Sequence, residues 1–248
     1  MIYDKLPVVL LSTLATCSEG DTNYVIASYI LNHVDDVKAL GIKDLAKRCH
    51  VGTGSISRFC REIGLDSFTE LKNSLNVLIS YDESHYASDS LSDHIQQAIA
   101  LTAQSVDQTR ISQLVNDLKT HRTIYAFGLL KAQNAATDFV VDMRMLNVEV
   151  KTAVAYGDQI DIIKNAGEGD LILIFSYTGS YFDTHIWRQE RIQLKQATIW
   201  MIMSGNHEIP PFVRHVIRFE SLQDQRSHPY QLEYIANLIT ETYAKGEE

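Results

Sequence analysis

Residues 43–63, KDLAKRCHVGTGSISRFCREI, decide the fold of the N-terminal part of the chain. The stretch divides into two short segments with helical spacing of apolar residues, 43–50 and 55–63. Between them Gly52 and Gly54 interrupt the helical pattern. Two short helices around a tight turn are typical of a helix-turn-helix, in which the second helix enters the major groove of DNA. A helical hairpin with solvated charges is the alternative that this pattern leaves open.

Short polar and basic side chains fill the positions from which a helix-turn-helix would contact DNA. The candidates at or near the groove are Thr53, Gly54, Ser55, Ser57, Arg58 and Arg61. Lys47 and Arg48, at the end of the first segment, are candidate phosphate contacts. An arginine that binds guanine through two hydrogen bonds selects sequence, whereas a phosphate contact adds affinity without selection. The hydroxyls of Thr53 and Ser55 also predict a capped N-terminus for the second helix.

Residues 23–80 resemble the N-terminal domain of the RpiR family of bacterial transcription regulators. The family's usual run appears here as Leu45-Ala46, Val51-Gly52, Ser55 and Arg58-Phe59-Cys60, followed by a related segment at residues 63–68. A last helix is expected over residues 69–80. Gly52 stands where the family usually has Ser, so Thr53 is expected to supply the missing hydroxyl. The resemblance implies that residues 1–80 form a helix-turn-helix domain that binds double-stranded DNA.

The formal net charge of −9 is unusual for a DNA-binding protein, but the charge is unevenly distributed. Residues 1–80 hold eight Lys and Arg against nine Asp and Glu, while the rest of the chain holds fourteen against twenty-two. Within residues 43–72 the balance is positive, six against four. A basic face of this size gives modest, salt-dependent affinity. It therefore predicts a homodimer or tetramer whose heads bind the two half-sites of a palindromic operator.

Length and composition indicate two domains, because 248 residues with 45% hydrophobic content can bury two cores. No run of eighteen apolar residues occurs, and the first residues lack the basic region of a secretory signal. The chain is therefore expected to be cytoplasmic, without a membrane partner. Cys17, Cys49 and Cys60 lack metal or redox spacing, so no metal site and no cofactor are expected. Cys49 and Cys60 are expected to pack in the core.

From about residue 105 the sequence alternates between strand and helix patterns. Strands are expected at 123–127, 148–153, 171–176, 198–203 and 215–219. Helices are expected at 91–106, 111–118, 132–145, 158–165, 184–193 and 229–243. The polar, Ser-rich stretch 82–93 is typical of a linker. The sequence therefore predicts an all-α domain over residues 1–80, a linker and connecting helix over 81–104, and over 105–248 an α/β domain whose parallel sheet lies between helices.

Two loops after strands of this sheet carry candidate anion-binding residues. Gly128 and Lys131 follow the first strand, and the hydroxyl-rich loop after the third strand contains Ser176, Thr178, Gly179 and Ser180. Loops at the carboxyl ends of parallel strands, before helix N-termini, bind anions in many α/β proteins, so the pattern is consistent with a phosphate site. A turn that merely caps the next helix is the alternative. Lys131 has two interpretations, a charge that pairs with an anionic ligand or a solvated residue that opens the next helix.

Residues 105–244 resemble the sugar isomerase (SIS) domain, which binds phosphosugars and often accompanies an RpiR-type DNA-binding domain. Asp170, Ser176 and Gly179 match the family's second-loop pattern, Thr178 keeps a hydroxyl, and Tyr181 replaces a threonine. Gly128 matches in the first loop, whereas the family's Gly and Ser positions are occupied by Leu130, Lys131 and Ala132. The resemblance implies an effector of the phosphosugar type, bound between subunits. Because of these departures, we expect this effector to differ from the family's usual one.

Together these features predict a DNA-binding regulator of sugar-metabolism genes, with operator affinity modulated by a phosphosugar or related anion. One alternative is that the SIS-like domain serves only for dimerisation. Another is a phosphosugar isomerase, whose general base would come from His228 or Glu233. His228 is also a candidate effector contact, because it opens the closing helix. No catalytic residue is assigned, and the chain is not expected to be an enzyme.

Overall fold

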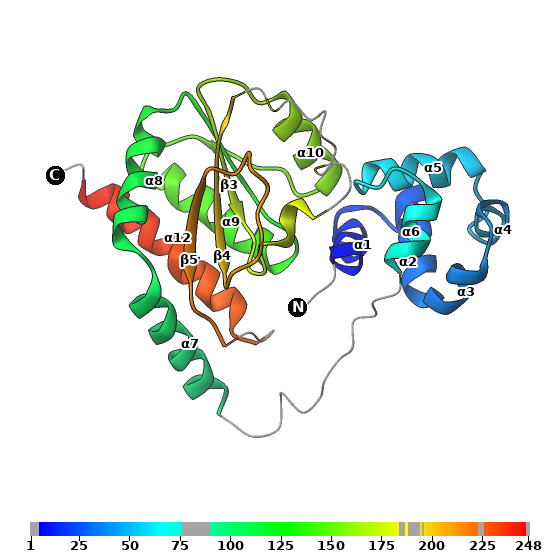
Figure 1. Ribbon diagram of the computed structural model, residues 1–248, viewed down its shortest axis with the longest axis horizontal. Coiled ribbons are helices and arrows are strands. Elements are labelled where there is room, and N and C mark those ends of the chain that lie inside the picture. The colour runs from blue at the N-terminus through cyan, green and yellow to red at the C-terminus, as the bar shows by residue number, and fades with distance from the viewer. Residues whose placement is uncertain are drawn as a thin grey trace.

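The computed structural model describes residues 5–75, 90–183, 187, 194, 196–222 and 226–246. Residues 5–75, here called the head, are helical, and residues 90–246, here called the body, form an α/β domain with a parallel sheet (Figure 1). The expected fold class is therefore confirmed. Most of the expected linker, residues 82–89, lies outside the described residues, and Leu91 to Asp93 belong to a helix instead.

The head consists of six helices around one apolar core. They are α1 Lys5–Thr16, α2 Thr22–Asn32, α3 Val34–Ala39, α4 Ile42–Arg48, α5 Thr53–Glu62 and α6 Phe68–Ser74. The side chains of Ile26, Leu45, Ile56 and Phe59 are fully buried, because each helix turns its apolar stripe inward. Cys49 and Cys60 are buried among them, as expected, and burial raises the pKa of the Cys60 thiol to about 12.

The predicted cap of α5 is wrong. Thr53 is the first residue of the helix, and its N-cap is Gly52, so no side-chain hydroxyl occupies the capping position. The helix accordingly begins two residues earlier than expected. By contrast, α6 has a side-chain cap: the hydroxyl of the N-cap residue Ser67 accepts from the Glu70 N–H at 3.2 Å, and the Glu70 carboxylate accepts from the Asp66 N–H at 2.7 Å. The part of the expected last helix beyond residue 75 lies outside the described residues.

The described residues of the body contain five strands, which form one parallel sheet in the order β2-β1-β3-β4-β5. They are β1 Thr123–Phe127, β2 Val150–Lys151, β3 Asp170–Phe175, β4 Thr198–Ser204 and β5 His215–Phe219. Four agree closely with expectation. The second is much shorter than the predicted 148–153, because it lies at the edge and pairs with β1 only through Val150 and Lys151.

Helices cover both faces of the sheet. In the described part of the body, the helices with assigned bounds are α7 Leu91–Ser105, α8 Gln108–Thr120, α9 Lys131–Met145, α10 Tyr156–Asn165 and α12 His228–Lys245, with a 3₁₀ turn η2 at Ser180–Phe182. Phe139 of α9 and Leu232 of α12 pack in one buried cluster, and Ile160 of α10 packs in another that contains Phe182 and Trp187. The helix expected at 184–193 lies outside the described residues, except for helical Trp187.

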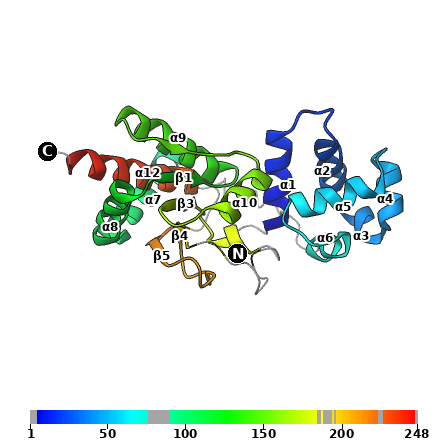
Figure 2. The same cartoon turned by 90° about the horizontal axis from the view of Figure 1, so that it is seen from above.

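The head meets the body through α1 and α10. The two helices lie side by side in both views, with the last turn of α5 next to α10 (Figures 1 and 2). Leu6 and Val9 of α1 belong to the same buried cluster as Ile160 and Ile163 of α10. In the described part of the chain, no helix is long and apolar enough to cross a membrane.

Candidate DNA-binding and effector sites

The outward face of α5 brings the predicted groove contacts together. Ile56, Phe59 and Cys60 point into the head, which leaves the opposite side of the helix to solvent. Thr53, Gly54, Arg58 and Arg61 are exposed on that side, and Ser55 and Ser57 are half-buried. The face thus combines two guanidinium groups with short polar side chains, which is the chemistry needed to contact base edges and phosphates.

Lys47 and Arg48 are exposed at the end of α4, but only Arg48 has described polar partners on neighbouring helices. Its Nη1 donates to the Tyr29 hydroxyl at 3.0 Å and lies 3.6 Å from a carboxylate oxygen of Asp36. The Tyr29 ring in turn stacks on His33, with centroids 4.2 Å apart. Arg48 is therefore held in one place on the head, beside a carboxylate that competes with any phosphate.

The two candidate effector loops follow neighbouring strands at the carboxyl edge of the sheet. The first loop, residues 128–131, follows β1, and the second loop, residues 176–181, follows β3. The chain leaves β1 towards α9 on one face and, after β3, enters η2 on the other. Such a switch point is where open α/β sheets commonly bind ligands.

Side-chain amides occupy the polar backbone groups of Gly128 in the first loop. The Gly128 N–H donates to Gln133 Oε1 at 3.0 Å, and the Gly128 carbonyl accepts from Gln159 Nε2 at 2.9 Å. A Cβ at this position would lie 2.6 Å from the backbone of Ala132, so only glycine allows α9 to start so close. Glycine is therefore required at position 128 by the packing of α9. The Gly128 N–H already donates to Gln133, so a ligand would have to replace that bond.

Leu130 adopts a backbone conformation that glycine favours. Its φ is 52° and its ψ is −118°, close to the first central position of a type II′ turn. This is the residue that stands where the SIS pattern has glycine. The first loop therefore keeps the backbone shape of a glycine-containing loop with a leucine in it, and Lys131 follows as the exposed first residue of α9.

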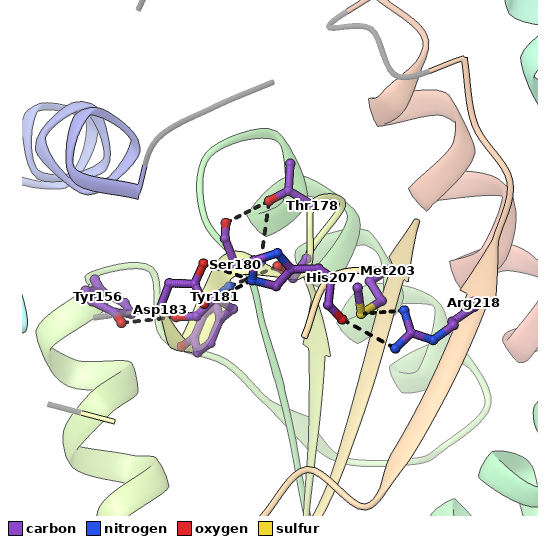
Figure 3. Close-up of polar contacts among 9 residues, drawn as sticks. Tyr156, Thr178, Ser180, Tyr181, Asp183, Met203, His207 and Arg218 are labelled. Carbon is purple, nitrogen blue, oxygen red and sulfur yellow. Dashed lines mark hydrogen bonds and ion pairs between the residues drawn. The ribbon is translucent and has the colours of Figure 1, made fainter. Parts of the chain in front are cut away.

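The second loop is a tight turn whose hydroxyls contact one another (Figure 3). Gly179 has a φ of 78° and donates its N–H to the Ser176 carbonyl at 2.8 Å. The Ser176 hydroxyl accepts from the Tyr181 N–H at 3.2 Å, and the hydroxyls of Thr178 and Ser180 lie 2.7 Å apart. These bonds fit the capping interpretation, and a phosphate would have to replace some of them to bind here.

His207 and Asp183, which the sequence analysis missed, lie against the second loop. His207 Nε2 is 2.9 Å from Asp183 Oδ2, and Arg218 donates to the carbonyls of Gly205 at 2.6 Å and His207 at 3.5 Å (Figure 3). A Cβ on Gly179 would lie 2.9 Å from the Cβ of His207. No motif spacing connects these residues, because β4 and the connection after it bring them together only in the fold.

His228, one of the candidate effector contacts, also lies beside the second loop. It is the first residue of α12, only 6% exposed, and its ring centroid is 4.6 Å from that of Tyr177. The Tyr177 hydroxyl donates to Ser221 Oγ at 2.7 Å, which fixes the ring against which His228 packs.

Glu233 does not join His228 at the loops. Its carboxyl lies beside Asp138 and Asp142 in the middle of α9, and Asp138 is seven residues past the start of that helix, roughly 10 Å along its axis. Burial, followed by the charge of Asp138, raises the pKa of Glu233 to about 7. This shift has a structural cause and does not mark a base at the candidate effector site.

The fold defines a class of protein that joins a helical unit containing a helix-turn-helix to a parallel α/β unit. Residues 18–81 match the model of the helix-turn-helix domain of the rpiR family. The N-terminal part of the chain is therefore similar to the DNA-binding domain of rpiR-family regulators. The predicted resemblance of the N-terminal domain is confirmed.

Relatives support the same assignment. The chain is 28% identical over 170 residues to an uncharacterised HTH-type transcriptional regulator of Caldanaerobacter subterraneus subsp. tengcongensis, with 62% of this chain and 59% of the relative covered. It is 25% identical to the HTH-type transcriptional regulator HexR of Pseudomonas aeruginosa, with 62% and 58% covered. The matched part thus spans under two thirds of these relatives. The structure of Vibrio vulnificus NanR complexed with ManNAc-6P shares the fold, with a TM-score of 0.56 and 15% identity over 97% of this chain and 92% of NanR.

The raised pKa of Glu233 predicts how stability depends on pH. Because the folded protein holds this proton more tightly than the unfolded chain, stability should fall as pH rises from about 4.5 to about 7. Glu233→Gln removes this loss, so the free energy of unfolding at pH 8 should rise by about 1 kcal/mol, a value discounted for solvent screening. Urea unfolding at pH 5 and pH 8 measures it. Glu241→Gln, at an exposed position of the same helix, is the control; equal effects of the two variants would contradict the assignment.

Proposed function

We propose that the protein is a cytoplasmic transcriptional regulator that binds operator DNA through α5 and responds to a phosphosugar or related anion at the two loops of the body. The observation that carries the proposal is the outward face of α5 in an rpiR-family domain, with Arg58 and Arg61 beside short polar residues. Lys47 and Arg48 would hold phosphates, and a homodimer or tetramer would place two heads on a palindromic operator.

The effector part of the proposal rests on the loops at the switch point of the sheet. Ser176, Thr178, Gly179 and Ser180 supply hydroxyls and a positive-φ glycine at the carboxyl end of β3, and His228 lies next to them. Lys131 supplies a cation at the start of α9. HexR, similar in sequence to this chain, is a transcriptional regulator, and NanR, which shares the fold, was solved in complex with ManNAc-6P.

A body that serves only for dimerisation is the second candidate. The side-chain amides of Gln133 and Gln159 form hydrogen bonds with the backbone of Gly128, and the hydroxyls of Thr178 and Ser180 contact each other. These polar groups therefore have partners within the protein in the absence of a ligand. An isomerase receives less support, because Glu233 faces Asp138 and Asp142 on α9.

Arg58→Ala should abolish sequence-specific DNA binding while the protein stays folded, since a bidentate contact between Arg and guanine is worth about 1–3 kcal/mol. Duplexes selected by the wild-type protein from a random library supply the target, and fluorescence anisotropy measures affinity. Lys47→Ala should instead weaken all duplexes alike and lower the salt slope by about one. Arg110→Ala on α8, an exposed arginine of the body, is the matched control. An Arg58→Ala protein that binds like the wild type would refute the recognition-helix assignment.

A phosphosugar should raise the melting temperature of the protein. Hexose, pentose and amino-sugar phosphates, including ManNAc-6P, are to be compared with their parent sugars by thermal shift. A ligand at 100 times its Kd stabilises by about 2.7 kcal/mol. The shift should require the phosphate and disappear in Ser176→Ala and Thr178→Val. If a panel that shifts an intact SIS protein leaves this one unchanged, the dimerisation role is favoured.

A further inference from the structure

Gln159 of α10 joins the two effector loops to each other. Its side chain is fully buried, and its Nε2 donates to the carbonyl of Gly128 at 2.9 Å and to that of Ala153 at 2.7 Å. Its Oε1 accepts from the Tyr181 hydroxyl at 2.6 Å. Burial raises the pKa of Tyr181, so the hydroxyl keeps its proton and remains a donor. One side chain of α10 therefore contacts the backbone of the first loop and the last residue of the second.

A second contact fixes the start of the same helix to the second loop. The Tyr156 hydroxyl donates to the Tyr181 carbonyl at 3.2 Å and accepts from Trp187 Nε1 at 3.1 Å. The rings of Tyr156 and Tyr181 pack edge to face, with centroids 5.6 Å apart (Figure 3). Any rearrangement of the loops must therefore move α10 or break these buried bonds, which is costly.

The other side of α10 faces α5, the helix proposed to enter the major groove. A Cβ on Gly157 would lie 3.3 Å from the backbone carbonyl oxygen of Glu62, the last residue of α5. Beside this contact is a cavity of about 800 Å³ between head and body. Its wall includes Arg58 and Arg61 from α5, and Asp158 and Asp161 from α10. The arginines expected to contact DNA thus share a cavity with two exposed carboxylates of the body.

We propose that α10 couples the effector loops to DNA binding, with Gln159 as the positioning residue at one end and Asp158 and Asp161 as the residues that compete with DNA for Arg58 and Arg61 at the other. This inference rests on the proposed function. Carboxylates in the wall of the same cavity as the arginines carry the same charge as DNA phosphates, so they should repel a duplex that approaches Arg58 and Arg61 from this side. A change at the loops alters that contact because Gln159 and Tyr156 hold the helix to them.

The DNA end of the coupling can be tested without any effector. The double variant Asp158→Asn/Asp161→Asn should bind a short duplex of mixed sequence about fivefold more tightly than the wild type, the scale expected when two exposed charges near the arginines are removed. Asp138→Asn/Asp142→Asn on α9 changes the net charge equally at a place that packs on α12, and should have a smaller effect. Equal gains in the two double variants would mean a general charge effect and would overturn the competition.

The loop end is tested by Tyr181→Phe, which removes only the hydroxyl that donates to Gln159. Release of α10 should tighten duplex binding by about threefold, a fraction of the value of one buried hydrogen bond. Tyr177→Phe is the matched control, because its hydroxyl lies in the same loop and donates to Ser221 instead. Melting temperatures of both variants report any loss of folded protein.

A double-mutant cycle joins the two ends. Because the released helix matters only through its carboxylates, Tyr181→Phe should have no effect in the Asp158→Asn/Asp161→Asn background, and the two gains should not multiply. Independent gains, or no effect of Tyr181→Phe in either background, would overturn the coupling. Failure of the proposed function has a different signature: duplex binding would then be absent from the wild type, or insensitive to Arg58→Ala.

Discussion

Loops at the carboxyl ends of parallel strands contain backbone N–H and C=O groups that no neighbouring strand pairs, and burying them is costly unless other polar groups reach them. In this protein the side-chain amides of Gln133 and Gln159 form hydrogen bonds with the backbone of Gly128. The Tyr181 hydroxyl donates to the side-chain oxygen of Gln159. A glutamine can donate and accept at once. The close approach of α9 and α10 to the sheet edge therefore depends on a few buried amides.

The negative charge of the molecule is concentrated in the part of the chain after residue 80. A strongly acidic body repels DNA over most of its surface, which confines any productive approach to the head. The same acidity brings carboxylates near the recognition helix wherever the two units touch, and α10 is where they touch. The net negative charge, which looks unfavourable for DNA binding in the composition, lies mainly outside the head.

The sequence was sufficient for whatever depends on periodicity and local motif. The helix-turn-helix, four of the five strands and the outward face around Arg58 follow from residue spacing, because one face of each element is buried. The cap of α5 was mispredicted, since the helix start depends on backbone geometry around Gly52 rather than on the nearest hydroxyl. The edge strand was overestimated because its length is set by its one neighbour.

The buried network and the His207 pair could not have been predicted. Gln159 looks like an ordinary polar residue in an amphipathic helix, and its role appears only when β1 and β3 place two loops around it. Asp183 and His207 are separated by a strand and have no shared motif. Contacts of this kind arise from tertiary structure, whereas the matches of Ser176 and Gly179 were visible because a single loop carries them.

The conformation of Leu130 has an energetic consequence. Residues other than glycine held in such backbone regions cost about 1–3 kcal/mol, which the surrounding packing must supply. That stored free energy is of the same size as the coupling that typically connects two allosteric sites. The first loop is therefore strained at Leu130, and a backbone change that relieved this residue would release free energy of that size.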